Sequence, residues 1–303
     1  MSAQTIAAPV AAPTVELTGR ITFAQTVSHS LALAGRGFMK FMKSPIQLVD
    51  VILTPIISLL MFVYLFGEAM GGGNTDAYIE LVVPGVMVMA VFQASVGIGA
   101  SLAADASTGI FDRFRSMPIA RSAPLIGAVL ADIVRYVACL VTLVVLALVM
   151  GYRFGTNPVA WLGASALLIG FALAFSWMSV YLGMLIKNPT SVQGLMTILI
   201  LPLTFASNVF MKETEMAGWL QAWSDVNPVS LVAEAVRGLL NGGPVAHGLY
   251  GSLIWMAAVV AVFFPLAMRA YRKSGPRPAV QVPSARSSSH RSASWREYAA
   301  PLS

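Results

Sequence analysis

The chain has 303 residues, of which 57% are hydrophobic and only 11% are charged, with a formal net charge of +6 and a mean hydropathy of +0.76. Soluble domains carry about 25% charged residues and about 45–50% apolar residues. This composition excludes an ordinary soluble enzyme and a disordered chain, because so few charges cannot cover a soluble surface. The single cysteine, Cys139, also excludes an internal disulfide. We therefore expect an all-α polytopic membrane protein.

The N-terminal part predicts a tail followed by a helix on the membrane surface. Residues 1–19 are rich in Ala, Pro and Thr, and Pro9 and Pro13 interrupt the apolar core that a secretory signal needs. We interpret them as a disordered cytoplasmic tail. Residues 20–45 mix large apolar side chains with basic ones and end at Ser44-Pro45, a pattern typical of an amphipathic interfacial helix. An irregular lead-in to the first span is the alternative.

Six apolar segments follow within a predicted transmembrane domain of residues 46–273. They occupy residues 47–66, 81–104, 124–150, 159–186, 192–207 and 249–268. Five of them have 20 to 28 residues, enough for a hydrocarbon core of about 30 Å. The fifth has 16 residues, contains Pro202 and rises only about 24 Å. We expect six transmembrane helices, with the fifth broken near its outer end and followed by re-entrant outer helices.

The basic residues are distributed unevenly over the two sides that these spans define. One side, made of the N-terminal segment, residues 105–123 and 187–191, and the tail from 269, holds 15 of the 19 Lys and Arg residues. The positive-inside rule then places both termini in the cytoplasm. Residues 274–303 are rich in Ser, Pro and Arg and have little to bury, so we expect a disordered basic cytoplasmic tail. The net charge thus indicates orientation rather than nucleic-acid binding.

Common catalytic and nucleotide-binding motifs are missing from the sequence. There is no Gly-x-x-x-x-Gly-Lys-Ser/Thr string, no Gly-x-Ser-x-Gly and no His-Glu-x-x-His. The three histidines (His29, His247 and His290) are isolated in different regions. We therefore expect a chain that is not itself an enzyme and binds no metal or cofactor.

The predicted cytoplasmic loop after the second span combines apolar and charged side chains. Ile110, Phe111 and Phe114 form an apolar patch, and the spacing of Asp112 and Arg115 lets them pair on one helical face. A short amphipathic helix with aromatic anchors can dock into a partner's groove. A basic loop that only fixes topology is the alternative. The candidate docking residues are Ile110, Phe111, Asp112, Arg113, Phe114 and Arg115.

Two further groups of residues within the spans are candidates for function. Asp132 and Arg135 lie inside the third span at a spacing that lets them neutralise each other, as a structural ion pair or as a polar point on a substrate path. A path for an apolar substrate needs apolar and aromatic walls with few polar groups. The candidates for it are Met89, Phe92, Gln93, Thr197 and Phe205, for which ordinary helix packing is the alternative.

Several stretches resemble the membrane subunit of a type-2 ABC exporter, within the daunorubicin-resistance-type permeases. The similarity runs from about residue 36 to 273. Its motifs are GIFDRFRSMPI at 109–119, APLIG at 123–127, LVDVI at 48–52, YLFG at 64–67, PLTFASNVF at 202–210, GWLQA at 218–222, VNPVS at 226–230 and AVRGL at 235–239.

The resemblance implies a partner, a location and a mechanism. Two permeases pair in a bacterial plasma membrane, forming a homodimer or joining a similar chain, and each rests on a separate ATPase subunit that binds ATP and Mg. The loop containing residues 110–115 acts as the coupling helix. The cargo is an amphipathic hydrophobic compound, such as a drug or a self-made antibiotic. Export of a cell-envelope glycolipid or polysaccharide is the alternative.

An ion-coupled transporter or channel is disfavoured, because Asp132 is the one acidic residue well inside a span.

The region after the fifth span also fits the resemblance. Asn is a favoured N-cap and Pro suits the first helical turn, so we expect a helix from Asn227-Pro228 to about Leu240, ended by the following Gly-Gly. Such helices line the outer mouth of these exporters. An external gate and a packed cap are both compatible with this region, and the gate candidates are Asn208, Phe210, Asn227, Pro228 and Arg237.

Overall fold

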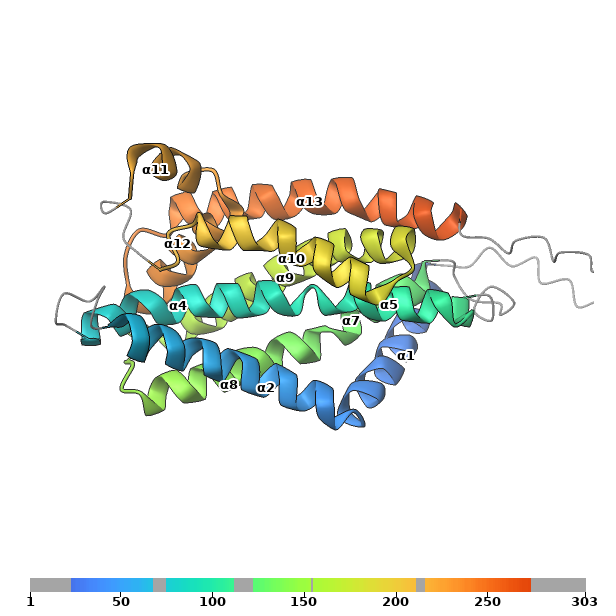
Figure 1. Ribbon diagram of the computed structural model, residues 1–303, viewed down its shortest axis with the longest axis horizontal. Helices are drawn as coiled ribbons and strands as arrows, with labels where there is room; N and C mark the ends of the chain where they lie inside the picture. The colour runs from blue at the N-terminus through green and yellow to red at the C-terminus, as the bar shows by residue number, and fades with distance from the viewer. Residues whose placement is uncertain (1–22, 68–74, 112–121, 154, 211–215, 274–303) are drawn as a thin grey trace, which may run out of the picture.

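The computed structural model describes residues 23–67, 75–111, 122–153, 155–210 and 216–273, and every regular element within these ranges is a helix (Figure 1). The helices are α1 Phe23–Met42, α2 Pro45–Leu60, the π-helix η1 Met61–Leu65, α4 Thr75–Ala94, α5 Gly97–Ser107, α7 Ala123–Ala131, α8 Ile133–Val149, α9 Pro158–Ile186, α10 Pro189–Phe205, α11 Gly218–Ser224, α12 Pro228–Asn241 and α13 Ala246–Lys273.

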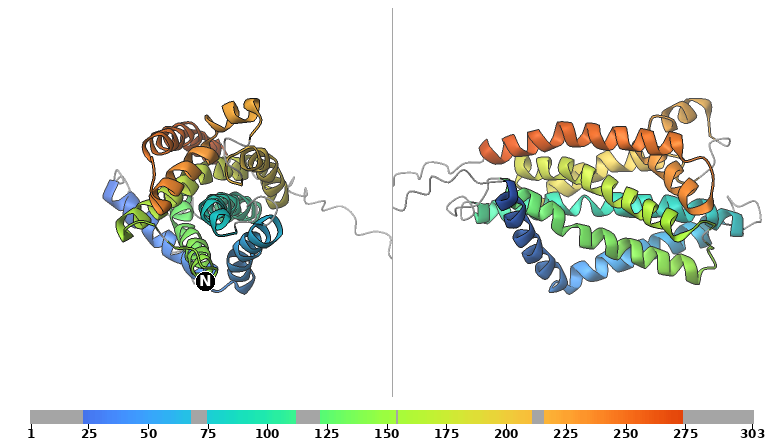
Figure 2. Two further views of the ribbon diagram at one scale, coloured as in Figure 1. Left: turned by 90° about the vertical axis from the view of Figure 1, so that its left-hand side faces the viewer. Right: turned by 180° about the vertical axis from the view of Figure 1, so that it is seen from behind.

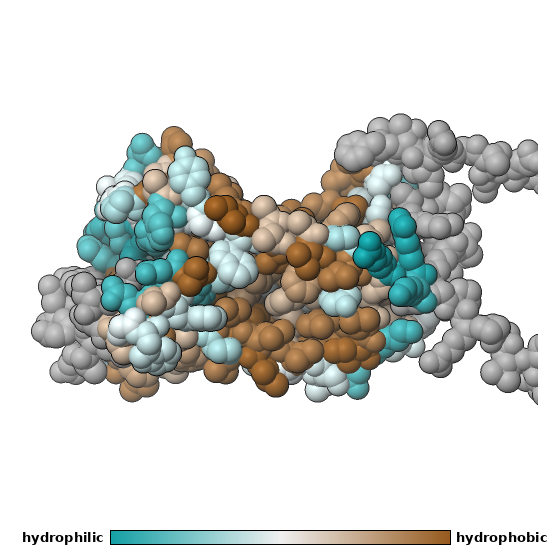
Figure 3. All heavy atoms as spheres, turned by 90° about the horizontal axis from the view of Figure 1, so that it is seen from above, coloured by the Kyte–Doolittle hydropathy of each residue, from teal (hydrophilic) through white to brown (hydrophobic). Residues whose placement is uncertain are grey.

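Five helical segments among the described residues are long and apolar enough to cross a membrane. They are Pro45–Leu65, Tyr78–Ser107, Ala123–Val149, Pro158–Ile186 and Ala246–Lys273. Viewed from above, the surface is mostly hydrophobic along the middle of the bundle, with hydrophilic side chains gathered towards the two ends (Figure 3). The apolar helix α10 lies beside these segments but has only 17 residues. The all-helical membrane fold is confirmed, whereas the count of six spans stays a prediction.

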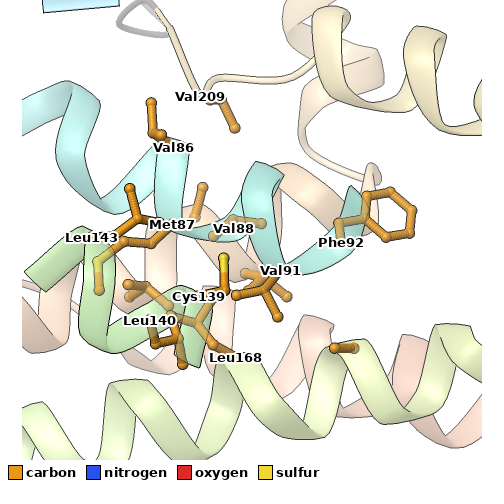
Figure 4. Packing of buried hydrophobic residues seen from close by; sticks show 14 of the residues in the cluster. Val86, Met87, Val88, Val91, Phe92, Cys139, Leu140, Leu143, Leu168 and Val209 are labelled. Atoms are coloured by element: carbon orange, nitrogen blue, oxygen red, sulfur yellow. The ribbon is translucent and has the colours of Figure 1, made fainter. Parts of the chain in front are cut away.

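The segment α4–α5 lies at the centre of the bundle. Its most apolar window is 67% buried, against 22% to 44% for the other four segments. Seen from the end, it is surrounded by the other helices (Figure 2). Figure 4 shows one part of the packing, in which Met87 of α4 lies near Leu143 of α8, and Val91 of α4 lies near Cys139 of α8 and Leu168 of α9. Because lipid tails are as apolar as these side chains, close packing rather than water exclusion holds such helices together.

The first predicted span passes from α2 directly into η1, and the second and third are each divided into two α-helices. The second divides between α4 and α5, where the Ser95 hydroxyl donates to the Phe92 carbonyl oxygen at 2.6 Å. Across this break the Ser179 hydroxyl of α9 donates to the Val96 carbonyl oxygen at 2.8 Å and accepts from the Gly99 amide at 3.1 Å. A Cβ at Gly99 would collide with the Ser179 backbone, so α5 and α9 touch backbone to backbone. The third span divides at Asp132, between α7 and α8.

Helix α1 runs obliquely to the bundle at the end where α5 and α13 also finish (Figures 1 and 2). It packs mainly against α7. It lies within the segment predicted as an interfacial helix, residues 20–45, of which residues 20–22 lie outside the described ranges, and its place on a membrane surface stays a prediction. The two predicted tails, residues 1–19 and 274–303, also lie outside them.

Candidate functional site

A cavity of about 360 Å³ lies on one flank of the bundle, between α2 and α10, with α4 behind it. We name it the flank cavity. Most of its wall is apolar, and polar side chains come from four of the five contributing helices, namely α2, α4, α8 and α10. Its lining residues are Asp50, Val51, Thr54, Pro55, Ser58, Val86, Met89, Ala90, Gln93, Ala94, Val96, Gly97, Arg135, Cys139, Gln193, Thr197, Ile200, Leu201, Thr204 and Phe205.

The flank cavity brings together four of the five residues predicted for a substrate path. Met89 and Gln93 of α4 face Thr197 and Phe205 of α10 across it. Phe92 does not line it. That side chain is fully buried on another face of α4, with its ring 5.2 Å from Phe171 and 4.8 Å from Phe175 between centroids. Phe92 therefore belongs to the helix packing in this structure.

The cavity also has polar residues that the sequence patterns did not single out. Asp50, Thr54 and Ser58 line it from α2, and the Thr54 hydroxyl donates to Asp50 Oδ1 at 3.1 Å. From α10, Thr204 contributes a buried hydroxyl with no hydrogen-bond partner among the described residues. A signal for the α2 residues was present, because three polar residues four apart form one helical stripe.

Asp132 and Arg135 form the ion pair that their spacing predicts. Asp132 Oδ1 and Arg135 Nη2 are 3.7 Å apart, and the two side chains are only 13% and 16% exposed. The Arg135 guanidinium also lies 5.7 Å from the centroid of the Phe41 ring of α1. The pair therefore sits where α1, α7 and α8 meet.

A second cavity, of about 300 Å³, lies between α1, α5 and α7, and we name it the inner cavity. It contains Arg36 and Lys40 of α1 and Asp105 of α5, with Lys40 Nζ 3.4 Å from Asp105 Oδ1. Arg135 lines this cavity as well as the flank cavity.

The inner cavity borders the start of the predicted docking loop. Ile110 lines it, and Phe111 is buried with its ring 5.4 Å from that of Tyr271 in α13, which ties the loop to that helix. The other four docking candidates, Asp112, Arg113, Phe114 and Arg115, lie outside the described residues.

Most of the gate candidates meet at the opposite end of the bundle. Asn227 is the N-cap of α12, as predicted, and its side-chain oxygen accepts from the Val229 amide at 2.9 Å. Its Nδ2 donates to the carbonyl oxygens of Leu203 at 2.7 Å and Ala206 at 3.3 Å, at the end of α10. One side chain thus joins the end of one helix to the start of another.

Arg237 and Asn208 add a second link between α12 and the segment after α10. Arg237 Nη2 donates to the Asn208 carbonyl oxygen at 2.7 Å. Pro228 is the first residue of α12 and is buried. The indole of Trp255 in α13 donates to the Val226 carbonyl oxygen at 2.9 Å, which ties α13 to the turn between α11 and α12.

Phe210 belongs to a cluster of four aromatic rings beside the part of the flank cavity that Phe205 lines. Its ring lies 4.3 Å from that of Phe62 in η1 and 5.6 Å from that of Phe205, and Phe62 also stacks on Phe66 at 5.6 Å. Phe205 is part of the cavity wall. The cluster therefore connects the cavity with the gate candidates, and it includes a π-helical turn of a kind that is frequent at functional sites.

The C-terminal end of α12 is held by polar contacts with two other elements. The Tyr152 hydroxyl donates to the Asn241 side chain, and Asn241 Nδ2 donates to the Glu80 carbonyl oxygen of α4 at 2.8 Å. Burial, reinforced by the Glu80 carboxylate, raises the pKa of Tyr152 well above its ordinary value. Tyr152 therefore stays protonated and able to donate at neutral pH. Within the described ranges, no three His, Cys, Asp or Glu side chains gather as a metal site would require.

Residues 29–241 match the family model described as ABC-2 type transporter. The chain belongs to this family. A daunorubicin resistance ABC transporter permease, DrrB1 from Streptomyces coeruleorubidus, is 41% identical over 249 residues, which cover 82% of this chain and 88% of that protein. A probable doxorubicin resistance permease, DrrC from Mycobacterium tuberculosis, is 24% identical over 88% of this chain and 95% of its own length. A putative transport permease, ycf38 from Cyanophora paradoxa, is 24% identical over 71% and 75%.

The family membership confirms the resemblance seen in the sequence. The chain is an ABC-2 type permease similar to permeases of drug resistance, and it is a multi-pass membrane protein. The flank cavity, the inner cavity and the gate candidates all involve residues within the matched range.

Proposed function

We propose that the chain is the permease subunit of an ATP-driven exporter that moves an amphipathic hydrophobic compound out of the cytoplasm or the inner leaflet. The flank cavity carries this proposal, because it is large enough for part of a small molecule and combines an apolar wall with a few polar side chains. The names of two relatives, which refer to daunorubicin and doxorubicin resistance, support a drug-like substrate. ATP and Mg are bound by a separate ATPase subunit, present in two copies.

The exposed polar residues of the cavity support a second permease subunit on this flank. Asp50, Thr54 and Gln193 are exposed although they lie on apolar helices. Ionisable and polar residues within a membrane face other protein or a water-filled space rather than lipid. A second copy of the chain placed against α2 and α10 would cover them and complete a central path from two flank cavities.

The inner cavity supports the coupling role of residues 110–115. Ile110 and Phe111 connect this loop to the cavity wall and to α13, so a displacement of the loop by an ATPase subunit would be transmitted to both. In this proposal the end with α1 faces the cytoplasm of a bacterial plasma membrane. The opposite end then carries the gate, which opens when the ring of Phe210 separates from that of Phe62.

Transport by the complex of this chain with its ATPase tests the proposal. The complex is placed in inside-out vesicles, and ATP-dependent uptake is measured by fluorescence for two amphiphiles, the cationic daunorubicin and an anionic fatty acid that carries a fluorophore. Ala90→Phe fills the flank cavity from α4 and should reduce uptake several-fold. Gly163→Phe adds the same side chain on the exposed face of α9, where no atom lies within 4 Å of an added Cβ, and should leave uptake unchanged.

The coupling role has its own variant. Phe114→Asp with Arg115→Glu should abolish uptake while the permease still folds. Uptake that continues in this variant would remove the coupling assignment, and uptake that is independent of ATP would remove the proposed function.

A further inference from the structure

Arg135 is the one described residue that lines both the flank cavity and the inner cavity. Its guanidinium occupies the notch left by Gly97 at the break between α4 and α5, where a Cβ would collide with Nη1. The side chain therefore lies in the wall that separates the two cavities. A ligand that passes from one cavity to the other has to move past this group.

The hydrogen-bonding capacity of Arg135 is not filled by the described part of the chain. A guanidinium has five N–H donors. The contact with Asp132 spans 3.7 Å, which is too long for a hydrogen bond, and the buried Nε has no hydrogen-bond partner among the described residues. The buried Oδ2 of Asp132 also has no hydrogen-bond partner among the described residues. A buried charge normally has both a partner and full hydrogen bonding, so the unpaired Nε of Arg135 indicates an acceptor from outside the chain.

The charges around the inner cavity favour an anionic acceptor. Three basic residues (Arg36, Lys40 and Arg135) face two acidic ones (Asp105 and Asp132). Lys40 and Asp105 are within 3.4 Å of each other and largely compensate. A planar guanidinium with free donors matches a phosphate or carboxylate, which it binds through two parallel hydrogen bonds.

The apolar walls of the two cavities indicate what the rest of the ligand is made of. Around the inner cavity, Leu33, Ile98 and Leu102 are apolar. Around the flank cavity, Met89, Ile200 and Leu201 are apolar, and the acidic Asp50 already accepts from Thr54. A molecule with one anionic group and an apolar body satisfies Arg135 and these walls together.

We propose that Arg135 binds the head group of an amphiphile that carries a phosphate or carboxylate, and that this head group passes from the inner cavity to the flank cavity over the Arg135 side chain. The proposal rests on the proposed export function and names the chemical class of its cargo. An uncharged or cationic cargo is the competing outcome.

Binding to the full-length permease in nanodiscs of zwitterionic lipid tests this proposal without the ATPase. The probes are dodecyl phosphate and dodecyltrimethylammonium, which share one tail and differ in head-group charge, and binding is measured by equilibrium dialysis. Wild type should bind dodecyl phosphate more tightly than the cationic probe. A charge-assisted contact corresponds to roughly tenfold to a hundredfold in affinity.

Two variants remove this contact in different ways. Arg135→Gln combined with Asp132→Asn removes both charges, so no unpaired buried charge remains to unfold the protein. Gly97→Ala keeps both charges and displaces the guanidinium from its notch. Each should weaken binding of dodecyl phosphate by roughly tenfold or more and leave the cationic probe unchanged. Arg269→Gln removes one exposed charge from α13, outside both cavities, and should have no effect.

The outcomes separate this proposal from the proposed function. Unchanged binding of dodecyl phosphate in both variants, or tighter binding of the cationic probe to wild type, would overturn the anionic site. Competition by phosphatidylglycerol in the nanodisc would assign the site to a lipid phosphate, and lack of competition to a free amphiphile; either result keeps the site. Selective binding of dodecyl phosphate by a permease that does not export with ATP would contradict the proposed export function and leave the anionic site in place.

Discussion

At the scale of single residues, Asn227 makes contacts that its sequence position alone predicts only in part. The Asn-Pro pair predicts an N-cap, and the cap is present. The same side chain also donates to two carbonyl oxygens at the end of α10, which have lost their own helical donors. Its role is therefore larger than that of an ordinary cap.

We expect Asn227→Ala to destabilise the end of the bundle that contains α11 and α12. Loss of a cap costs about 1 kcal/mol, and the carbonyl oxygens of Leu203 and Ala206 would lose a donor in addition. Hydrogen exchange of α12 and the melting temperature of the purified protein measure the effect. Asn188→Ala is a matched control, because Asn188 also precedes a proline and caps α10 through a single amide, that of Ser191. Equal losses in the two variants would contradict this account.

At the scale of helices, the contact between α5 and α9 depends on a position without a side chain. Gly99 lies directly against the backbone of Ser179, and Ser179 holds the Val96 carbonyl oxygen at the break between α4 and α5. Small residues permit this approach of two membrane helices. Helix α5 of the central segment is therefore fixed to α9 as well as to α4.

We expect Gly99→Ala to lower stability by about 1–3 kcal/mol, because the new methyl group meets rigid backbone and the helices have to separate. Gly194→Ala in α10 is the control, since no atom lies within 4 Å of the added carbon there and alanine favours a helix by up to about 1 kcal/mol. Thermal unfolding in detergent compares the two variants. A Gly99→Ala protein as stable as wild type would show that the two backbones are free to move apart.

The sequence predicts best the helices whose ends are set by residues adjacent in the chain. The starts of α9 and α12 are set by an Asn-Pro pair, and α12 is followed by Gly242 with φ at 80°, a conformation suited to glycine. The breaks at Ser95 and Asp132 were not predicted. The contact that holds the first of them joins residues 83 positions apart, which no local pattern reveals.

The candidate site, like the helix ends, was predicted from the sequence only in part. The residues chosen on α4 have the right composition for a cavity wall, but Met89 faces the cavity and Phe92 faces the core. Periodicity distinguishes the faces of a helix without saying what each face meets. The polar stripe on α2 was readable from Asp50, Thr54 and Ser58, whereas the placement of Arg135 between two cavities depends on the break beside Gly97.

At the scale of the whole molecule, the exposed polar flank predicts how two copies meet. We expect Thr54→Cys to form cross-links between two copies in membranes treated with a short bifunctional thiol reagent, because α2 faces the partner in the proposed pair. Val141→Cys on the exposed face of α8 is the control and should not cross-link. The native Cys139 is buried and is replaced by serine in both variants. Gel electrophoresis detects the dimer, and equal cross-linking at both positions would contradict the arrangement.

The distribution of charge predicts the orientation of the whole chain. Arg269, Arg272 and Lys273 end α13 near α1, whereas Glu80 and Glu234 lie towards the opposite end. A fluorescent protein fused after residue 274 should therefore fold and emit in the cytoplasm. Alkaline phosphatase inserted after Gly243 should be active outside. The reverse pair of results would invert the assigned orientation.

The hydrogen bond between Trp255 and Val226 has a practical consequence for spectroscopy. Indole emission changes when its N–H partner or its contact with water changes, and Trp255 is bonded to the turn that joins α11 and α12. Any displacement of these two helices from α13 alters that environment. In a variant with Trp219 and Trp223 replaced by phenylalanine, which removes two exposed indoles of the same region, movement of α11 and α12 relative to α13 becomes measurable in real time without an attached dye.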